Sequence, residues 1–161
     1  MPKFFEDLEL NEPGAAVVTL LAVKVLVMTF LRGGSLTLAR WEEFDLKKDL
    51  LETLRSFNGD QEYVFFSPRG RTFPHVHRDS LNNHLKNMGY KGLTTAHGFR
   101  HLALTAGQEV LKVDHEIIQR QMAHTFGDKI RGSYDKSQMM EERRDFMVAW
   151  SDALLEQGLI T

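Results

Sequence analysis

The run of apolar residues from Ala15 to Leu31 constrains the fold of this chain more than any other feature. Within it only Thr19, Lys24 and Thr29 are polar. The run is long enough to raise the question of a membrane span, but a lysine at its centre is costly in lipid and polar sequence surrounds it. The sequence therefore predicts a helix buried in the core of a globular domain, and no membrane partner.

The hydrophobic spacing around this run predicts further helices. Pro13 is expected in the first turn of the buried helix, which would end at Gly33 and Gly34. Apolar residues at helical spacing predict helices over 47–57, 79–88, 117–124 and 137–157. Thr94 or Thr95 is expected to cap one more helix, and the aromatic run 63–66 predicts a short strand. The chain is thus predicted to be mainly helical with a small β component.

Length and composition set the class of protein. With 161 residues, of which 42% are hydrophobic, the chain has the size of one domain with a core of its own. There is no cysteine, which excludes disulfides, a zinc ribbon and thiol catalysis. The N-terminus lacks the basic region and cleavage site of a secretory signal, so a cytoplasmic protein is expected.

Charge is concentrated in the middle of the chain. The net charge is −2, yet residues 66–101 carry six Lys/Arg against one acidic residue, and five of the seven histidines. A local basic stripe in an acidic domain is compatible with binding a phosphate backbone. An ordinary solvated surface is the alternative.

Four residues near the C-terminus indicate chemistry. His97-Gly98-Phe99-Arg100 is followed by Met122-Ala123-His124 and then by Tyr134. This order supplies a phenol nucleophile, with an arginine and two imidazoles to hold charge on a phosphodiester, and it needs no metal. Tyr134 lies in a polar segment, where a reactive phenol would be exposed, whereas Tyr63 and Tyr90 are expected to pack.

Each of these residues also has a simpler interpretation. Arg32, just before two glycines, could be a cation at a helix C-terminus. His97 and Arg100 could form a surface pair, and His124 could be a satisfied core histidine. His97 and His101 are spaced as in a zinc helix, but position 98 is glycine where the metalloprotease motif needs glutamate.

A series of segments, in order over most of residues 15–156, resembles the tyrosine recombinases of the prophage integrase type. The segments are Leu31-Arg32-Gly33-Gly34, Ala39–Asp45, Tyr63-Val64-Phe65, Leu81–Tyr90, Thr95–Arg100, Gln121–His124, Tyr134 and Glu141–Arg144. Each segment is weak evidence alone; the ordered set is strong.

The resemblance implies a mainly α catalytic-domain fold with a small antiparallel β-sheet, spanning residues 1–161 as one domain without the family's N-terminal DNA-clamping domain. It implies that Arg32 and Arg100 bind the non-bridging phosphate oxygens, while His97 and His124 donate to the phosphate or manage the tyrosine proton. Tyr134 would attack phosphorus and form a 3′-phosphotyrosine link, so that strands are rejoined without ATP, metal or cofactor.

The resemblance also implies partners. These are double-stranded DNA and, through the C-terminal helix of about residues 137–156, neighbouring subunits in a homotetramer. Packing of that helix against its own domain is the alternative. Without the clamping domain, weak DNA binding is expected, because affinity follows the number of phosphate contacts.

One departure from the family concerns catalysis. The family places a β-hairpin with a catalytic lysine after the segment Trp41–Asp45, whereas here Leu46 runs directly into Lys47 and the next predicted helix. That lysine protonates the departing 5′-oxygen, and neither Lys47 nor Lys48 matches its motif. Two alternatives therefore stand beside the enzyme: a catalytically impaired DNA-binding or assembly module, and a generic helical interaction protein.

Overall fold

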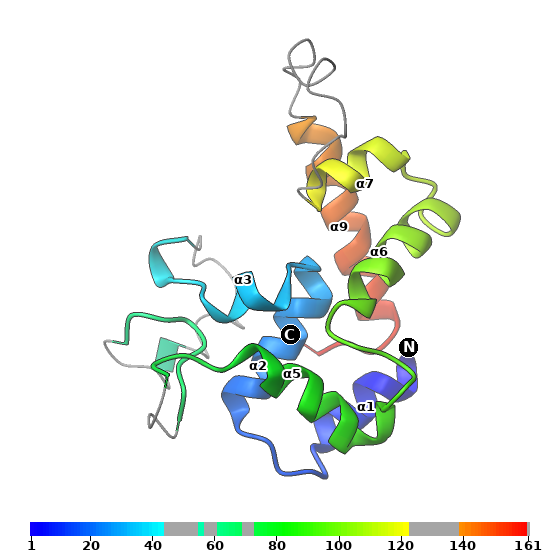
Figure 1. Cartoon of the computed structure of the whole chain (residues 1–161). Helices are drawn as coiled ribbons and strands as arrows, with labels where there is room; N and C mark the ends of the chain where they lie inside the picture. Colours follow the sequence, from blue (N-terminus) through cyan, green and yellow to red (C-terminus); the bar gives the residue numbers. More distant parts are fainter. Residues whose placement is uncertain (44–54, 57–60, 69–72, 123–138, 161) are drawn as a thin grey trace.

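The structure, a computed structural model, describes residues 1–43, 55–56, 61–68, 73–122 and 139–160 (Figure 1). Within these residues the chain is mainly helical, as predicted. The elements are α1 (Pro2–Leu10), α2 (Val17–Thr29), α3 (Gly33–Thr37), the 3-10 turn η1 (Trp41–Glu43), α5 (Arg78–Leu85), the π-helical turn η2 (Lys86–Tyr90), α6 (Gly98–Glu109), α7 (His115–Gln121) and α9 (Met140–Glu156).

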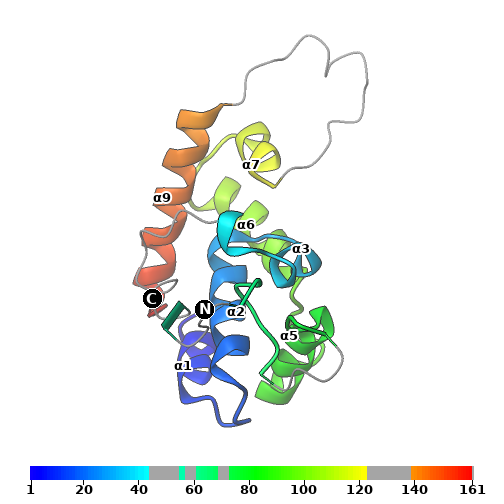
Figure 2. The ribbon, with the colours of Figure 1, turned by 90° about the vertical axis from the view of Figure 1, so that its left-hand side faces the viewer.

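Helix α2 is the buried core helix that the apolar run predicted. Every residue from Leu21 to Val27 is buried, and α3, α5 and α9 pack against it. A helix that is apolar on all sides must be covered on all sides, which explains its central place in Figure 2. Among the described residues, no helix is both long and apolar enough to cross a bilayer.

The N-terminal segment differs from the prediction. Helix α2 begins at Val17, and Pro13 lies in a turn before it; the proline in a first helical turn is Pro2, at the start of α1. Helix α1 was not predicted because acidic residues obscure its apolar face, which buries Phe4, Phe5 and Leu8. The α1–α2 connection is closed by Asn11, whose side chain bonds both the N–H and the C=O of Ala15 at 2.9 and 3.0 Å.

Two partners compensate the burial of Lys24 in the core. The side chain is 8% exposed, forms an ion pair with Glu9 of α1, and donates to the carbonyl of Ile160 at 2.9 Å. Burying an ammonium group requires such compensation. The lysine that argued against a membrane span therefore joins α1, α2 and the segment after α9.

Helix α9 confirms the predicted C-terminal helix and packs on its own chain. Its residues Phe146, Trp150 and Leu154 are buried, and α2, α6 and α7 cover them. The Trp150 indole donates to the carbonyl of Val27 at 3.1 Å, and the Phe146 ring lies 5.8 Å from that of Phe30. Packing of α9 against its own domain, the alternative to subunit contacts, thus accounts for the apolar face of this helix.

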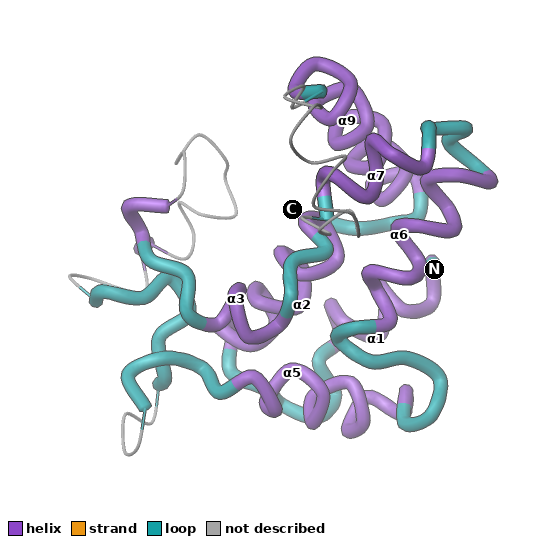
Figure 3. The backbone as a smooth tube through the Cα atoms, turned by 45° about the horizontal axis from the view of Figure 1, so that its top comes forward, coloured by secondary structure: helices purple, strands orange, loops and turns teal. Residues whose placement is uncertain are grey.

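The small antiparallel sheet is not formed by the described residues, which Figure 3 shows as helices and loops. Two isolated antiparallel bridges, Arg40–Tyr63 and Phe66–His75, take the place of the strand predicted over 63–66. The run is four residues long and Pro68 follows it, a residue that cannot donate to a ladder. The helix predicted over 47–57 falls mostly outside the described residues.

Gly107 allows α6 to pack closely on α7 and α9. A Cβ atom at this position would lie 2.7 Å from Ile118 Cδ1 and 3.2 Å from Phe146 Cε2, whereas one at Gly34 of α3 would meet no atom within 4 Å. Ile118 and Phe146 are both buried. The two neighbours therefore have little room to move away.

We expect Gly107→Ala to lower the free energy of unfolding by about 1–3 kcal/mol through overpacking. Gly34→Ala, the matched control, should be neutral or stabilise by up to about 1 kcal/mol, because alanine favours the helix. Urea denaturation followed by circular dichroism measures both. Stabilisation by Gly107→Ala would contradict the close packing of α6.

Candidate active site

Arg32 lies between two helices and faces solvent. Phe30 ends α2 in the left-handed conformation with a φ of 43°, and Arg32, extended and exposed, is the N-cap of α3. Gly33 and Gly34 therefore begin a helix, whereas the sequence predicted that they end one. The ends of α2 and α3, which pack against each other, hold the short connection that carries the Arg32 guanidinium.

Arg100, three residues into α6, is buried and bonded to the backbone. It is 5% exposed; Nη1 donates to the carbonyl of Phe30 at 2.6 Å, and Nη2 to the carbonyl of Met122 at 2.8 Å. Phe30 is the C-cap of α2 and Met122 the C-cap of α7. One guanidinium thus satisfies carbonyls at two helix C-termini, where the helix dipoles favour a cation.

The two arginines lie within electrostatic reach of each other. Burial lowers the pKa of Arg100, and the charge of Arg32 lowers it further. A guanidinium stays protonated in proteins, so two positive charges from separate elements act on the same region. Such a pair attracts an anion, and the planar guanidinium group matches the geometry of carboxylates and phosphates.

His97 is the exposed N-cap residue of α6, and its ring lies 5.1 Å from the ring of His101. The Thr95 hydroxyl accepts from the N–H of Gly98 at 3.0 Å, so the predicted side-chain bond is present although the N-cap position belongs to His97. In the part of the chain that the structure describes, no three His, Cys, Asp or Glu side chains gather in a way that would hold a metal ion.

His124 and Tyr134 lie outside the described residues, so their predicted roles stay predictions. In the sequence these two residues lie between α7 and α9. Those two helices are joined by a bond from Arg143 Nε to Gln121 Oε1 of 2.8 Å.

The other two tyrosines are packed, as predicted. The Tyr90 hydroxyl donates to Asp7 at 2.7 Å; burial, followed by this bond, raises the pKa of Tyr90 to about 12. The Tyr63 ring lies 5.1 Å from that of His75 and beneath the guanidinium of Arg40. A phenol with a raised pKa is a poor nucleophile at neutral pH.

One buried histidine was not predicted. His84 of α5 is 4% exposed, and its Nε2 has no hydrogen-bond partner among the described residues. Burial lowers the pKa of His84, because desolvation disfavours the charged imidazole. Its spacing from Leu81 and Leu85, which are also buried, is the sequence signal that places it on the core face of α5.

Known proteins similar to this chain are phage and prophage integrases. The integrase of Shigella phage Sf6 and the prophage integrase IntS of Escherichia coli (strain K12) are each 30% identical over 172 residues, covering 88% of this chain and 43% of their own length. The integrase of Enterobacteria phage P4 is 29% identical over 178 residues, covering 86% of this chain and 40% of its own. Neither a protein-family model nor a solved structure matches.

The chain is therefore of the phage integrase, or tyrosine recombinase, type, which confirms the resemblance that its motifs predicted. It spans less than half the length of these relatives. The matched regions of 172 and 178 residues are longer than the whole 161-residue chain. The relatives consequently contain residues inside the matched region that have no counterpart here.

Arg100 and Arg32 should differ sharply in their effect on stability. Arg100→Ala leaves two buried carbonyls without donors, so we expect the free energy of unfolding to fall by about 2–4 kcal/mol. Arg32→Ala removes an exposed side chain and should change it by less than about 0.5 kcal/mol. Chemical denaturation of the two variants measures this. Equal effects would contradict the burial of Arg100.

The bond between Tyr90 and Asp7 gives stability a dependence on alkaline pH. In the folded chain the pKa of Tyr90 is about 12, above the ordinary tyrosine value of 10.0. The contribution of Tyr90 to stability is therefore complete below pH 10 and is lost as the pH rises toward 12. We expect the stability difference between wild type and Tyr90→Phe to shrink over that interval, measured by urea denaturation at each pH. A difference that stays constant to pH 12 would contradict the raised pKa.

Proposed function

We propose that this chain is the catalytic region of a site-specific DNA recombinase of the integrase type, which cleaves and rejoins DNA strands by metal-free transesterification. The observation that carries the proposal is the bond of 2.6 Å from Arg100 of α6 to the carbonyl of Phe30, which brings one guanidinium to the short connection that carries the other, Arg32. The similarity to phage and prophage integrases supports the same reaction.

The proposed reaction exchanges one phosphate ester for another. The Tyr134 oxygen attacks phosphorus, the bond to the 5′-oxygen breaks, and the phenol proton leaves while the 5′-oxygen acquires one. The product is a 3′-phosphotyrosine link that keeps the ester bond energy, so attack by a 5′-hydroxyl reverses the step without ATP. Negative charge on the non-bridging oxygens grows in the transition state, which is where fixed cations contribute most.

Within this reaction we assign different tasks to the two arginines. Arg32 is exposed and can donate directly to the phosphate. Arg100 already donates through both terminal nitrogens to the carbonyls of Phe30 and Met122, so a bidentate grip on phosphate would compete with these bonds. The buried Arg100 therefore contributes positive charge to the site without binding the phosphate, and it fixes the backbone at Phe30, two residues before Arg32. His97, exposed at the start of α6, and His124 would donate to the phosphate or manage the tyrosine proton.

Double-stranded DNA is the proposed substrate, held in part by the basic stretch 66–101. A homotetramer through α9 is also proposed from the family resemblance. Because Phe146, Trp150 and Leu154 of α9 are covered in cis, such contacts would use its exposed residues Met140 and Val148, which are 60% and 56% exposed.

A second candidate function is a DNA-binding or assembly module with impaired catalysis. The specific observation in its favour is that the relatives carry residues within the matched region that this chain lacks. This agrees with the predicted absence of the hairpin that carries the lysine. Without a general acid for the 5′-oxygen, cleavage would be slowed by about 10²–10⁴-fold.

A nicked duplex carrying the attachment sequence of the parent element should trap the covalent intermediate, because the cleaved end diffuses away before rejoining. We expect a protein–DNA adduct that survives denaturing electrophoresis and is absent in Tyr134→Phe. Tyr63→Phe and Tyr90→Phe are the matched controls and should still form it. Binding of this duplex without any adduct would favour the impaired module.

A further inference from the structure

The segment from Phe73 to His77 carries a phenylalanine or histidine ring at every second position, and His75 forms an isolated antiparallel bridge with Phe66. Val76 points inward and is 4% exposed. The rings of Phe73, His75 and His77 share the other side: the Phe73 ring lies 5.8 Å from His75 and 5.3 Å from His77. Tyr63 extends the series, with its ring 5.1 Å from His75. We name these four residues the ring ladder.

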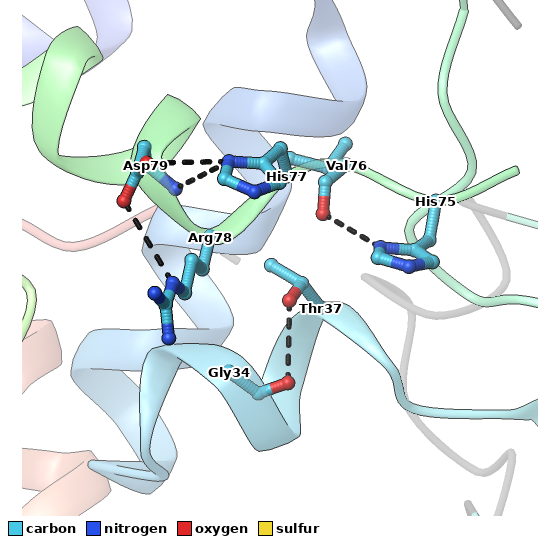
Figure 4. Close-up of polar contacts among 7 residues, drawn as sticks. All are labelled: Gly34, Thr37, His75, Val76, His77, Arg78 and Asp79. Carbon is cyan, nitrogen blue, oxygen red and sulfur yellow. Dashed lines mark hydrogen bonds and ion pairs between the residues drawn. The ribbon is translucent and has the colours of Figure 1, made fainter. Parts of the chain in front are cut away.

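Hydrogen bonds fix the backbone that carries the ring ladder. The N–H of Val76 donates to the carbonyl of Phe65 at 2.7 Å, and that of Ser67 donates to the carbonyl of Pro74 at 3.0 Å. His77 is held further by Asp79, whose N–H donates to the imidazole Nδ1 at 3.3 Å, as Figure 4 shows. Rings fixed in this way lose little entropy when a flat ligand stacks on them.

A cavity of about 470 Å³ adjoins the ring ladder, a size typical of small-ligand sites. Its lining includes Phe73, His75 and His77 of the ring ladder, the turn from Pro13 to Ala16, and the polar residues Ser80 and Asn83 of α5 and Asn87 of η2. Among the described residues that line it there is no aspartate or glutamate. The cavity thus combines stacking faces with amides and hydroxyls, and the nearby carboxylate of Asp79 lies 3.5 Å from the His77 imidazole.

Cations flank the ring ladder at both ends. The Arg40 guanidinium lies 5.8 Å from the centre of the Tyr63 ring, and Arg78, whose side chain is 73% exposed, follows His77. Each has an acidic neighbour, since Arg40 pairs with Glu62 at 3.0 Å and Arg78 lies 3.9 Å from Asp79. Figure 4 shows Arg78 directed toward α3, the helix that begins at Arg32.

We propose that the ring ladder and the adjoining cavity hold an unpaired nucleotide of single-stranded DNA. Aromatic and imidazole rings bind bases of any sequence by stacking, and side-chain amides hydrogen-bond the base edges. Phe73 is 46% exposed and the His77 side chain is 45% exposed, so both rings remain accessible. The choice of single-stranded DNA as the ligand rests on the proposed function in DNA recombination, in which strands are separated when they exchange. The position of the site is independent of that function.

Binding of a labelled oligothymidylate, followed by fluorescence anisotropy, tests the site. We expect Phe73→Ala to weaken this binding by about fivefold or more, because one base–aromatic stack is lost. Binding of the corresponding thymine–adenine duplex should not change, and Phe73→Tyr should bind oligothymidylate as the wild type does. Val110→Ala, which alters a side chain 71% exposed at the end of α6, is the matched control.

A second variant reports on stacking itself. Phe73→Trp places an indole in the ring ladder, and its fluorescence should be quenched by oligothymidylate but not by the duplex. Unaltered oligothymidylate binding in Phe73→Ala, or equal loss on both DNA probes, overturns the proposal. These outcomes are separate from covalent trapping at the nicked duplex, which alone decides the proposed recombinase function.

Discussion

The burial of α2 on every side is the constraint to which the rest of the fold responds. Residues Leu21 to Val27 have no polar face to turn toward water, so α3, α5 and α9 must cover them. The single charge in this helix, on Lys24, is compensated by Glu9 and the carbonyl of Ile160, which draws α1 and the end of the chain onto the same core. The candidate site is built where this helix ends, at Phe30.

Helices with a regular apolar stripe were predictable from the sequence. The core helix, α5 and α9 were found through their spacing, with boundaries shifted by a few residues. Helix α1 was missed because its apolar residues are mixed with acidic ones, and its burial depends on partners as distant as Tyr90 and Phe99. The predicted strand became isolated bridges because pairing is decided by distant segments, which a local β-pattern does not reveal.

The candidate site was predictable as a set of residue types but not as an arrangement. Motif order identified the family, which the similarity to integrases confirms, while His124 and Tyr134 lie outside the described residues. The burial of Arg100 was not predicted, because its motif indicated a phosphate ligand. Ala103 and Gly107, three and seven residues later, are also buried and mark the same helix face. The helix-end carbonyls that it binds come from α2 and α7, a relation that only the fold can supply.

The bonds of Arg100 also have a thermodynamic consequence for substrate recognition. An anion that draws this guanidinium outward must weaken its hold on the carbonyl of Met122, the last described residue before the segment that contains Tyr134. By linkage, binding of such an anion and release of that carbonyl influence each other to the same extent. In the recombinase proposed above, binding of a phosphate would therefore loosen the contact between Arg100 and the end of α7.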